Sequence, residues 1–346
     1  LIKRKMKPQV IIVNGESGSG KSTNRKLIQD YLVTATCPTR DHSAGATDLL
    51  RSGAVGNYNT AGLPDAAARL LHANVILDAF GNAYTTRNSS GCGSSMFSQY
   101  LKIFFDNGTI AGAEITAFML DHSRLLEFRA RERTFHVFYM LLAGLDETSR
   151  NALGLRPINE YFLMCPLPSD DPDAFRGHTE EDKAGFARLL TAFEAFGITG
   201  TAVHQVLRLL AGILELGEIE FLSKDGYTVV TNLKKLEHAA ELLGVDQSTQ
   251  VRSGRPKAGT LEDSLIFKSD SQVRSATLAE AHETKNNIIR AIYSNLFHFL
   301  IAKINTVMGS QHDESNVDRT VFYSILDVTG LDHGGLVEEN SLERLC

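Results

Sequence analysis

The sequence predicts a mixed α/β protein in which a large helical insertion interrupts a core sheet. Two short apolar runs rich in β-branched or aromatic residues, 10–13 and 321–326, lie near opposite ends of the chain. Runs of this length are typical of buried strands. Most of the chain between them carries apolar residues at the spacing of an α-helix. This order of elements favours a sheet core with an inserted helical subdomain.

The first elements are a strand, a helix and a loop. A glycine cluster stops the strand at residues 10–13, and a helical period of about 3.6 residues begins at Lys21. The period fades before Pro38, and residues 38–64 are rich in Gly, Ser, Thr, Asp and Asn, so we expect a loop with one short helical stretch there. The apolar face of the predicted helix contains Leu27, Ile28, Tyr31 and Leu32.

A hairpin and a run of helices are predicted next. Residues 101–115 alternate between apolar and polar side chains around Asp106-Asn107-Gly108. Because a type I′ turn needs positive φ, which Asn-Gly supplies, this pattern predicts a two-stranded antiparallel element. The middle of the chain is expected to be mostly α-helical, with helical periods at residues 135–145, 186–196, 203–216, 233–243 and 278–304.

Composition excludes several classes of protein. The 346 residues include 41 acidic and 35 basic side chains, which argues against an electrostatic nucleic-acid binder. No apolar run approaches the roughly 18 residues that span a bilayer, and the apolar run after Pro8 is too short for a signal peptide, so we expect a cytoplasmic protein without a membrane span. The four cysteines are far apart and are expected to be free thiols. A start without Met and an end inside a helical pattern at Cys346 indicate a fragment.

Residues 15–22 match the phosphate-binding motif G-x-x-x-x-G-K-[ST] in full, with a predicted strand before it and a helix after it. Glycines let the backbone turn N–H groups inward, Lys21 adds a positive charge near the β- and γ-phosphates, and Ser22 is a ligand for Mg²⁺. The motif therefore predicts binding of a nucleoside triphosphate and narrows the fold to a P-loop NTPase-type core sheet with a large helical insertion. The predicted binding residues are Gly15, Glu16, Ser17, Gly18, Ser19, Gly20, Lys21 and Ser22.

Beyond this motif, residues 74–88 closely resemble the myosin segment N-P-x-L-E-A-F-G-N-A-K-T-x-R-N, which leads into switch I of the motor head. Further blocks resemble the family in the same order, at residues 104–108, 120–124, 132–139, 141–144, 213–221, 242–246, 293–297 and 326–332. The chain thus resembles a divergent myosin motor head, covering its N-terminal half and truncated at both ends.

The resemblance implies an organisation for the chain. Residues 1–135 would hold the phosphate loop, switch I and the hairpin of the nucleotide core. Residues 136–318 would form the mostly helical upper actin-binding subdomain. Residues 319–346 would supply a strand, switch II and the start of the relay helix.

The resemblance also implies an activity and residue roles. It implies a cytoskeleton-associated, actin-based motor ATPase that uses ATP and Mg²⁺ and binds filamentous actin. It does not decide whether the protein binds light chains. In family terms Lys21 contacts the phosphates, Ser22 and Asn88 organise the Mg²⁺ side, Asp327 lies in the second shell of the metal, and the Gly330 amide senses the γ-phosphate.

Two family motifs are altered. Aligned without gaps, the switch I motif R-N-x-N-S-S-R-F-G-K falls on residues 87–96, so Gly91, Cys92 and Gly93 replace two serines and an arginine. A slip of one or two residues would bring Ser89 and Ser90 into the serine roles, but no register restores the arginine. In switch II, D-I-x-G-F-E ends here in Asp332, whereas the family's glutamate pairs with that arginine.

These losses predict slow ATP hydrolysis, because each missing polar group in a catalytic site typically costs about a hundredfold in rate. The alternative is a catalytically weak, nucleotide-binding relative that acts as an actin tether or scaffold. An unrelated P-loop kinase or GTPase is disfavoured, since a GTPase needs a guanine-reading N-K-x-D motif and none is found.

Overall fold

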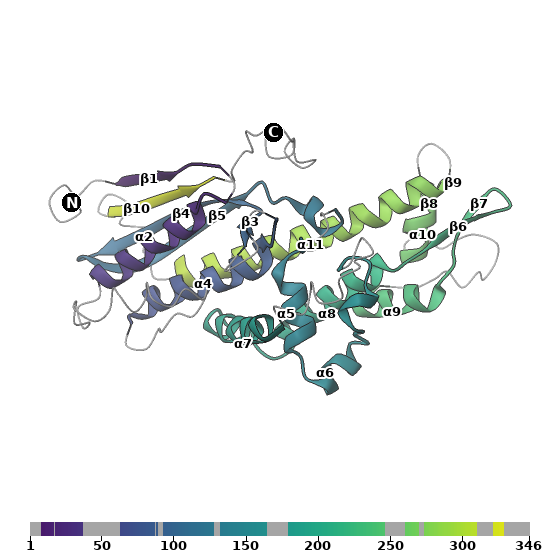
Figure 1. The fold of residues 1–346 in the computed structure, drawn as a ribbon, viewed down its shortest axis with the longest axis horizontal. Coiled ribbons are helices and arrows are strands. Elements are labelled where there is room, and N and C mark those ends of the chain that lie inside the picture. Colours follow the sequence, from purple (N-terminus) through teal and green to yellow (C-terminus); the bar gives the residue numbers. More distant parts are fainter. Residues whose placement is uncertain are drawn as a thin grey trace.

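The structure, a computed structural model, is mixed α/β with a sheet at one end and helices at the other (Figure 1). The residues that it describes are 8–16, 18–36, 63–86, 88, 93–127, 132–164, 179–245, 260–269, 273–309 and 321–328.

Four strands form the main sheet, in the order β1-β10-β4-β5. β1 (Gln9–Val13) pairs in parallel with β10 (Val321–Asp327), and β10 pairs antiparallel with β4 (Ser98–Asp106), which continues into β5 (Thr109–Phe118). Both predicted end strands and the hairpin are confirmed. The hairpin is not isolated, however, because β4 also pairs with β10 along its length.

The hairpin turn has the geometry that its sequence predicts. Asn107 and Gly108 have φ values of 48° and 85°. The far edge of the hairpin is closed by helix α11 (Leu278–Gly309), where the Asn305 side chain accepts a hydrogen bond from the Ile115 N–H at 2.8 Å and donates one to the Ile115 carbonyl at 2.7 Å. Backbone groups on an edge strand need such partners or solvent.

Helices α2 (Lys21–Thr36) and α4 (Asp65–Gly81) lie beside the sheet in Figure 1, and both contact its strands. The remaining helices are α5 (His136–Gly144), α6 (Glu147–Ala152), α7 (Thr179–Ala195), α8 (Thr201–Gly217), α9 (Leu233–Leu243) and α10 (Leu261–Ile266), with single turns at His122–Leu125 and Ile158–Glu160. The predicted helical stretches are confirmed by α2, α5, α7, α8, α9 and α11.

Three short pairs of strands lie outside the main sheet in the described part of the chain. β2 (Asn82–Ala83) pairs with β3 (Ser94–Ser95), β6 (Phe221–Lys224) with β7 (Tyr227–Val230), and β8 (Phe267–Ser269) with β9 (Val273–Ser275). The prediction of a mostly helical middle omits β6 and β7. Their turn contains Asp225 and Gly226 at φ values of 52° and 82°, a signal that the dominant helical period masked.

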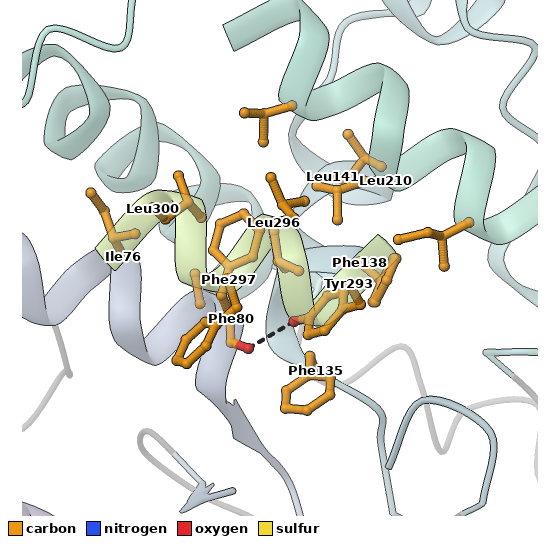
Figure 2. Packing of buried hydrophobic residues seen from close by; sticks show 14 of the residues in the cluster. Ile76, Phe80, Phe135, Phe138, Leu141, Leu210, Tyr293, Leu296, Phe297 and Leu300 are labelled. Atoms are coloured by element: carbon orange, nitrogen blue, oxygen red, sulfur yellow. Dashed lines mark hydrogen bonds between the residues drawn. The ribbon is translucent and has the colours of Figure 1, made fainter. Parts of the chain in front are cut away.

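The helices meet around the fully buried Tyr293 of α11 (Figure 2). Its ring stacks on Phe135 at 4.7 Å and on Phe138 at 5.7 Å between centroids. Its hydroxyl donates to the Phe80 carbonyl near the end of α4, at 2.7 Å. A buried tyrosine hydroxyl needs such an acceptor, and this one connects α11 to the segment that precedes β2.

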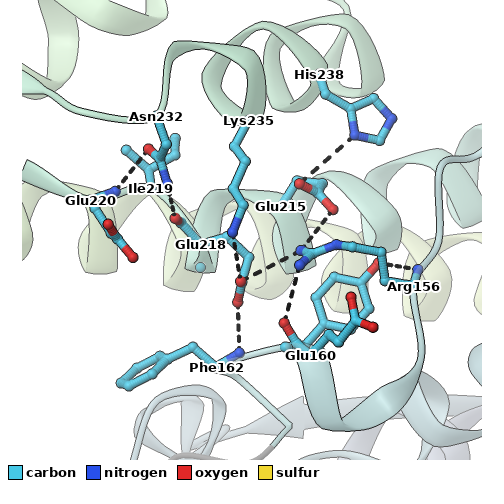
Figure 3. A network of polar contacts seen from close by, with 12 residues as sticks. Arg156, Glu160, Phe162, Glu215, Glu218, Ile219, Glu220, Asn232, Lys235 and His238 are labelled. Carbon is cyan, nitrogen blue, oxygen red and sulfur yellow. Dashed lines mark hydrogen bonds and ion pairs between the residues drawn. The ribbon is translucent and has the colours of Figure 1, made fainter.

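A polar network joins helices α8 and α9 to residues 156–162 (Figure 3). Glu218, directly after α8, accepts from the Phe162 N–H at 2.6 Å and from Lys235 Nζ of α9 at 3.2 Å. Arg156 donates to Glu215 Oε1 at 3.2 Å and lies 3.5 Å from Glu218 Oε2. One cation thus contacts two buried carboxylates that would otherwise repel each other.

Tyr293→Phe is expected to lower the free energy of unfolding by about 1–2 kcal/mol, because it deletes the donor to the buried Phe80 carbonyl and keeps the ring. The measurement is urea denaturation. Tyr227→Phe is the matched control, since Tyr227 is 64% exposed and should change stability by less than about 0.5 kcal/mol. Equal stability of both variants would show that the hydroxyl contact does not hold α11 to α4.

Candidate functional site

The phosphate-loop motif lies between the end of β1 and the start of α2. Gly18 and Gly20 have φ values of 78° and 83°, so the loop turns sharply just before the helix begins at Lys21. Left-handed glycines followed by a helix N-terminus direct backbone N–H groups to one side, where the helix dipole also favours an anion. The described residues of the loop therefore suit a phosphate group; Ser17 lies outside them.

Lys21 turns back over this loop. Its Nζ donates to the Glu16 carbonyl at 2.6 Å, and the side chain is largely buried. This contact fixes the positive charge of the ammonium beside the loop. Ser22 follows at the first turn of α2, half-buried, with the hydroxyl type that ligates Mg²⁺ in such loops.

Asp327 lies next to the phosphate loop because two strands run in parallel. Val13, where β1 ends, pairs with Asp327, where β10 ends. The carboxyl ends of adjacent parallel strands meet at one edge of the sheet, which is where ligands bind in open α/β sheets. The structure thus brings together two parts of the predicted site that are more than 300 positions apart in sequence.

The prediction of an apolar face on α2 is correct only in part. Ile28 and Leu32 are partly buried against the core, but Leu27 and Tyr31 are 38% and 69% exposed. The most buried side chains of the helix are mainly charged or polar, and they are Lys21, Arg25, Lys26, Gln29, Asp30, Val33 and Thr34.

Two cations on this face have carboxylate partners. Arg25 Nε lies 3.3 Å from Asp327 Oδ2, and Lys26 Nζ lies 2.6 Å from Asp78 Oδ2 of α4. The Asp78 carboxylate also accepts from the Asn82 side chain at 3.2 Å. Because buried charges are stable only when paired, these contacts fix α2 against both β10 and α4.

No prediction from the sequence included this network. Arg25, Lys26 and Asp30 lie within six positions of one predicted helix, and that density of charge was the available signal. The partners of Arg25 and Lys26 come from other elements, and no local pattern predicts the pairing. These partners are Asp327, Asn74 and Asp78.

Asn88 has contacts of its own that shape the predicted switch I. Its Nδ2 donates to the Gly93 carbonyl at 2.8 Å, and its N–H donates to the Thr85 carbonyl at 3.0 Å. In the described part of the chain its hydrogen bonds go to these neighbours and not to the phosphate loop. The contacts hold Asn88 against Thr85 and Gly93.

The backbone just before Asn88 is held by Glu132. Its Oε1 accepts from the Thr86 N–H at 3.1 Å and from the Thr86 hydroxyl at 3.3 Å, while Oε2 pairs with the buried Arg124. These contacts fix the start of the segment that the family resemblance identifies as switch I.

Gly93 does not have room for the arginine that a gap-free alignment places there. Its φ is +64°, and an added Cβ would lie 2.4 Å from the Ala83 carbonyl oxygen. Any side chain at this position strains the backbone. The neighbouring Ser94 is buried, pairs with Ala83 in the β2–β3 ladder, and has its hydroxyl 3.4 Å from that of Thr85. Gly91, Cys92, Gly330 and Asp332 lie outside the described residues.

Asp30 of α2 is the titratable group most affected by this environment. Burial raises its carboxyl pKa from 3.8 to about 6, and the positive charges of Lys26 and Arg25 offset only part of that effect. In the described residues its Oδ1 is buried without a hydrogen-bond partner. The charged form is therefore disfavoured.

Among the described residues, no group of three or more His, Cys, Asp and Glu side chains has an arrangement that would hold a metal ion. None of the helices described is both long enough and apolar enough to cross a membrane.

The comparisons with known proteins agree on one family. The sequence model of the family described as "Myosin head (motor domain)" matches residues 1–346. The chain is 31% identical over 349 residues to Myosin-2A of Naumovozyma castellii and 30% identical over 348 residues to Myosin-2 of Saccharomyces cerevisiae, with all of this chain and 20% of each relative covered. It is 28% identical over 356 residues to Unconventional myosin-Ic of Danio rerio, of which it covers 30%. The chain thus spans about a fifth of the length of the first curated relatives it matches.

Asp30→Asn is expected to raise the free energy of unfolding at pH 7.5 by about 1–3 kcal/mol, since a shift of one pKa unit is worth about 1.4 kcal/mol. The raised pKa means that the folded state binds the proton more tightly than the unfolded state between pH 4 and pH 6. Stability of the unaltered protein should therefore fall as pH rises through that window, and the advantage of the variant should vanish below about pH 4.

The measurement is urea denaturation across pH 4–8, with Asp225→Asn in the exposed β6–β7 turn as the control. A variant no more stable than the unaltered protein at pH 7.5 would show that the Asp30 carboxylate is not destabilised by its surroundings.

Proposed function

The chain belongs to the myosin head (motor domain) family, and from that premise we propose that it forms the nucleotide-binding part of an actin-based motor ATPase. The observation that carries the proposal is the complete phosphate-loop motif, folded as a glycine turn and a helix N-terminus beside Asp327. Myosins of this family hydrolyse ATP in general, so Mg·ATP is the proposed ligand. Filamentous actin, cytoskeletal location in the cytoplasm and motor activity belong to the proposal for the whole protein.

The proposed residue roles come from the family resemblance, and the geometry of the loop supports those of residues 15–22. When bound, Mg·ATP supplies the phosphoanhydride bond and the divalent cation. The backbone N–H groups of residues 15–20 and the Lys21 ammonium would hold its phosphates, Ser22 would ligate the metal, and Asp327 would lie in its outer shell. Asn88 would shape switch I around them, and Gly330 would contact the γ-phosphate. The subdomain boundaries at residues 135 and 318 are part of the same proposal.

We infer a different register for switch I from the surroundings of Gly93. If the loop after Asn88 is three residues longer than the motif, S-S-R-F-G-K falls on residues 94–99, so Ser94 and Ser95 keep the two hydroxyls. Phe97 then matches the motif's phenylalanine, and its ring occupies the space beside Gly81. Met96, 1% exposed, stands at the arginine position. The arginine is absent in this register too.

The loss of this arginine favours a second candidate function. A buried methionine cannot pair with an acid in switch II, so water would be excluded from the γ-phosphate less completely than in heads with the pair. The chain would then bind ATP and hydrolyse it slowly, which suits an actin tether or scaffold. Single-turnover hydrolysis by the whole protein, with and without filamentous actin, separates the two functions.

Lys21→Ala is expected to weaken Mg·ATP binding by about tenfold to a hundredfold, because it removes a charge-assisted contact to phosphate. Calorimetric titration measures the affinity, and Lys102→Ala is the control, since Lys102 pairs with Glu114 on the surface of the β4–β5 hairpin. Unchanged affinity in a folded Lys21→Ala protein would count decisively against the nucleotide site.

Met96→Arg combined with Asp332→Glu is expected to accelerate single-turnover ATP hydrolysis by about tenfold or more, because the two groups act as a unit. Gly93→Arg with Asp332→Glu is the matched comparison and should give no acceleration, since the Gly93 backbone is left-handed and crowded. Faster hydrolysis in the Gly93 pair than in the Met96 pair would restore the gap-free register.

A further inference from the structure

Arg25 lies one helical turn behind the predicted phosphate contacts. Positions 21, 22 and 25 are related by i, i+4 and i, i+3, so Lys21, Ser22 and Arg25 share one side of α2. Arg25 is 3% exposed, and its charge is therefore not screened by solvent as a surface charge would be.

The guanidinium is fixed by three elements. Nε lies 3.3 Å from Asp327 Oδ2 at the end of β10, and Nη1 donates to Asn74 Oδ1 of α4 at 3.1 Å and to Gln29 Oε1 of α2 at 3.2 Å. Gln29 in turn donates to the Leu70 carbonyl at 3.1 Å. An arginine held at several donors has one orientation, so the carboxylate that it contacts has one as well.

The two strand neighbours of Asp327 carry no charge. In the strand register Asp327 lies between Val13 of β1 and Gln99 of β4. Gln99 is 2% exposed, and neither atom of its carboxamide has a hydrogen-bond partner among the described residues. Within that part of the chain, Arg25 is the cation paired with Asp327.

We propose that Arg25 is a positioning residue for Asp327, which holds the carboxylate against α2 and neutralises it, so that the site accepts a nucleoside triphosphate with reduced dependence on a divalent cation. This inference rests on the proposed function. A buried carboxylate beside a phosphate loop repels the phosphates of a metal-free nucleotide, and a divalent cation normally removes that repulsion. A guanidinium paired with the carboxylate removes part of this repulsion whether or not a metal ion is bound.

The test compares ATP affinity in excess EDTA with ATP affinity at saturating Mg²⁺, by calorimetry on the whole protein. The quantity measured is the dissociation constant in EDTA divided by the dissociation constant at saturating Mg²⁺. Arg25→Met should raise this ratio by about tenfold or more, because it leaves the Asp327 charge without its partner. Arg25→Lys keeps the charge and should leave the ratio within about threefold of the unaltered protein.

Three further variants separate positioning from plain structural support. Lys285→Met removes a buried cation of α11 that donates to the Gly217 and Ile219 carbonyls and takes no part in docking α2, and it should leave the ratio unchanged. Adding Asp327→Asn to Arg25→Met removes the repelling carboxylate and should return the ratio to within about threefold of the unaltered protein. Asp327→Asn alone should lower the ratio, which keeps the test valid if Arg25→Met fails to fold.

The outcomes distinguish this inference from the proposed function. An Arg25→Met protein that loses affinity equally with and without Mg²⁺, or an Asp327→Asn protein with an unchanged ratio, would overturn the inference and leave the nucleotide site intact. No ATP binding by the unaltered protein under either condition would overturn the proposed function, and this inference with it.

Discussion

The pairing of two buried positive charges on α2 is the constraint on which the arrangement of the site depends. Arg25 and Lys26 are adjacent in sequence and both lie out of solvent, so each needs a carboxylate within contact distance. Asp327 and Asp78 supply them from β10 and α4. Removing one partner of such a pair typically lowers the free energy of unfolding by about 3–5 kcal/mol. A rotation or slide of α2 would break both pairs and is therefore strongly disfavoured. We infer that this double pairing sets how the helix behind the phosphate loop docks.

The same two ion pairs connect the phosphate loop to the segments that the family uses as switches. Through Arg25 the helix contacts the last residue of β10, from which switch II continues. Through Lys26 it contacts Asp78, whose carboxylate accepts from Asn82 at the start of β2. β2 pairs with β3, where Ser94 and Ser95 lie. A displacement of α2 would therefore reach both switch segments by direct contact.

The sequence predicted most elements and only part of the site. Strands at residues 10–13 and 321–326 and the Asn107-Gly108 hairpin have strong local signals, and all three are confirmed. The face of α2 was predicted only in part, because Ile28 and Leu32 pack against the core while Leu27 and Tyr31 are exposed, and the most buried side chains of the helix are mainly charged or polar. Its partners lie 52 and 302 positions away, and periodicity holds no information about contacts at that range. The crowding at Gly93 likewise comes from Ala83, a backbone neighbour that only the fold brings close.

Amide hydrogen exchange of the whole protein carrying Asp78→Asn tests the central claim most directly. The substitution keeps the size of the side chain and removes the charge paired with Lys26. If α2 is docked by both pairs together, exchange should accelerate in peptides from α2, from residues 82–95 and from β10, because losing one pair weakens the other. Acceleration confined to α4 around residue 78, with α2 and β10 unchanged, would contradict the account and show that apolar packing alone positions the helix.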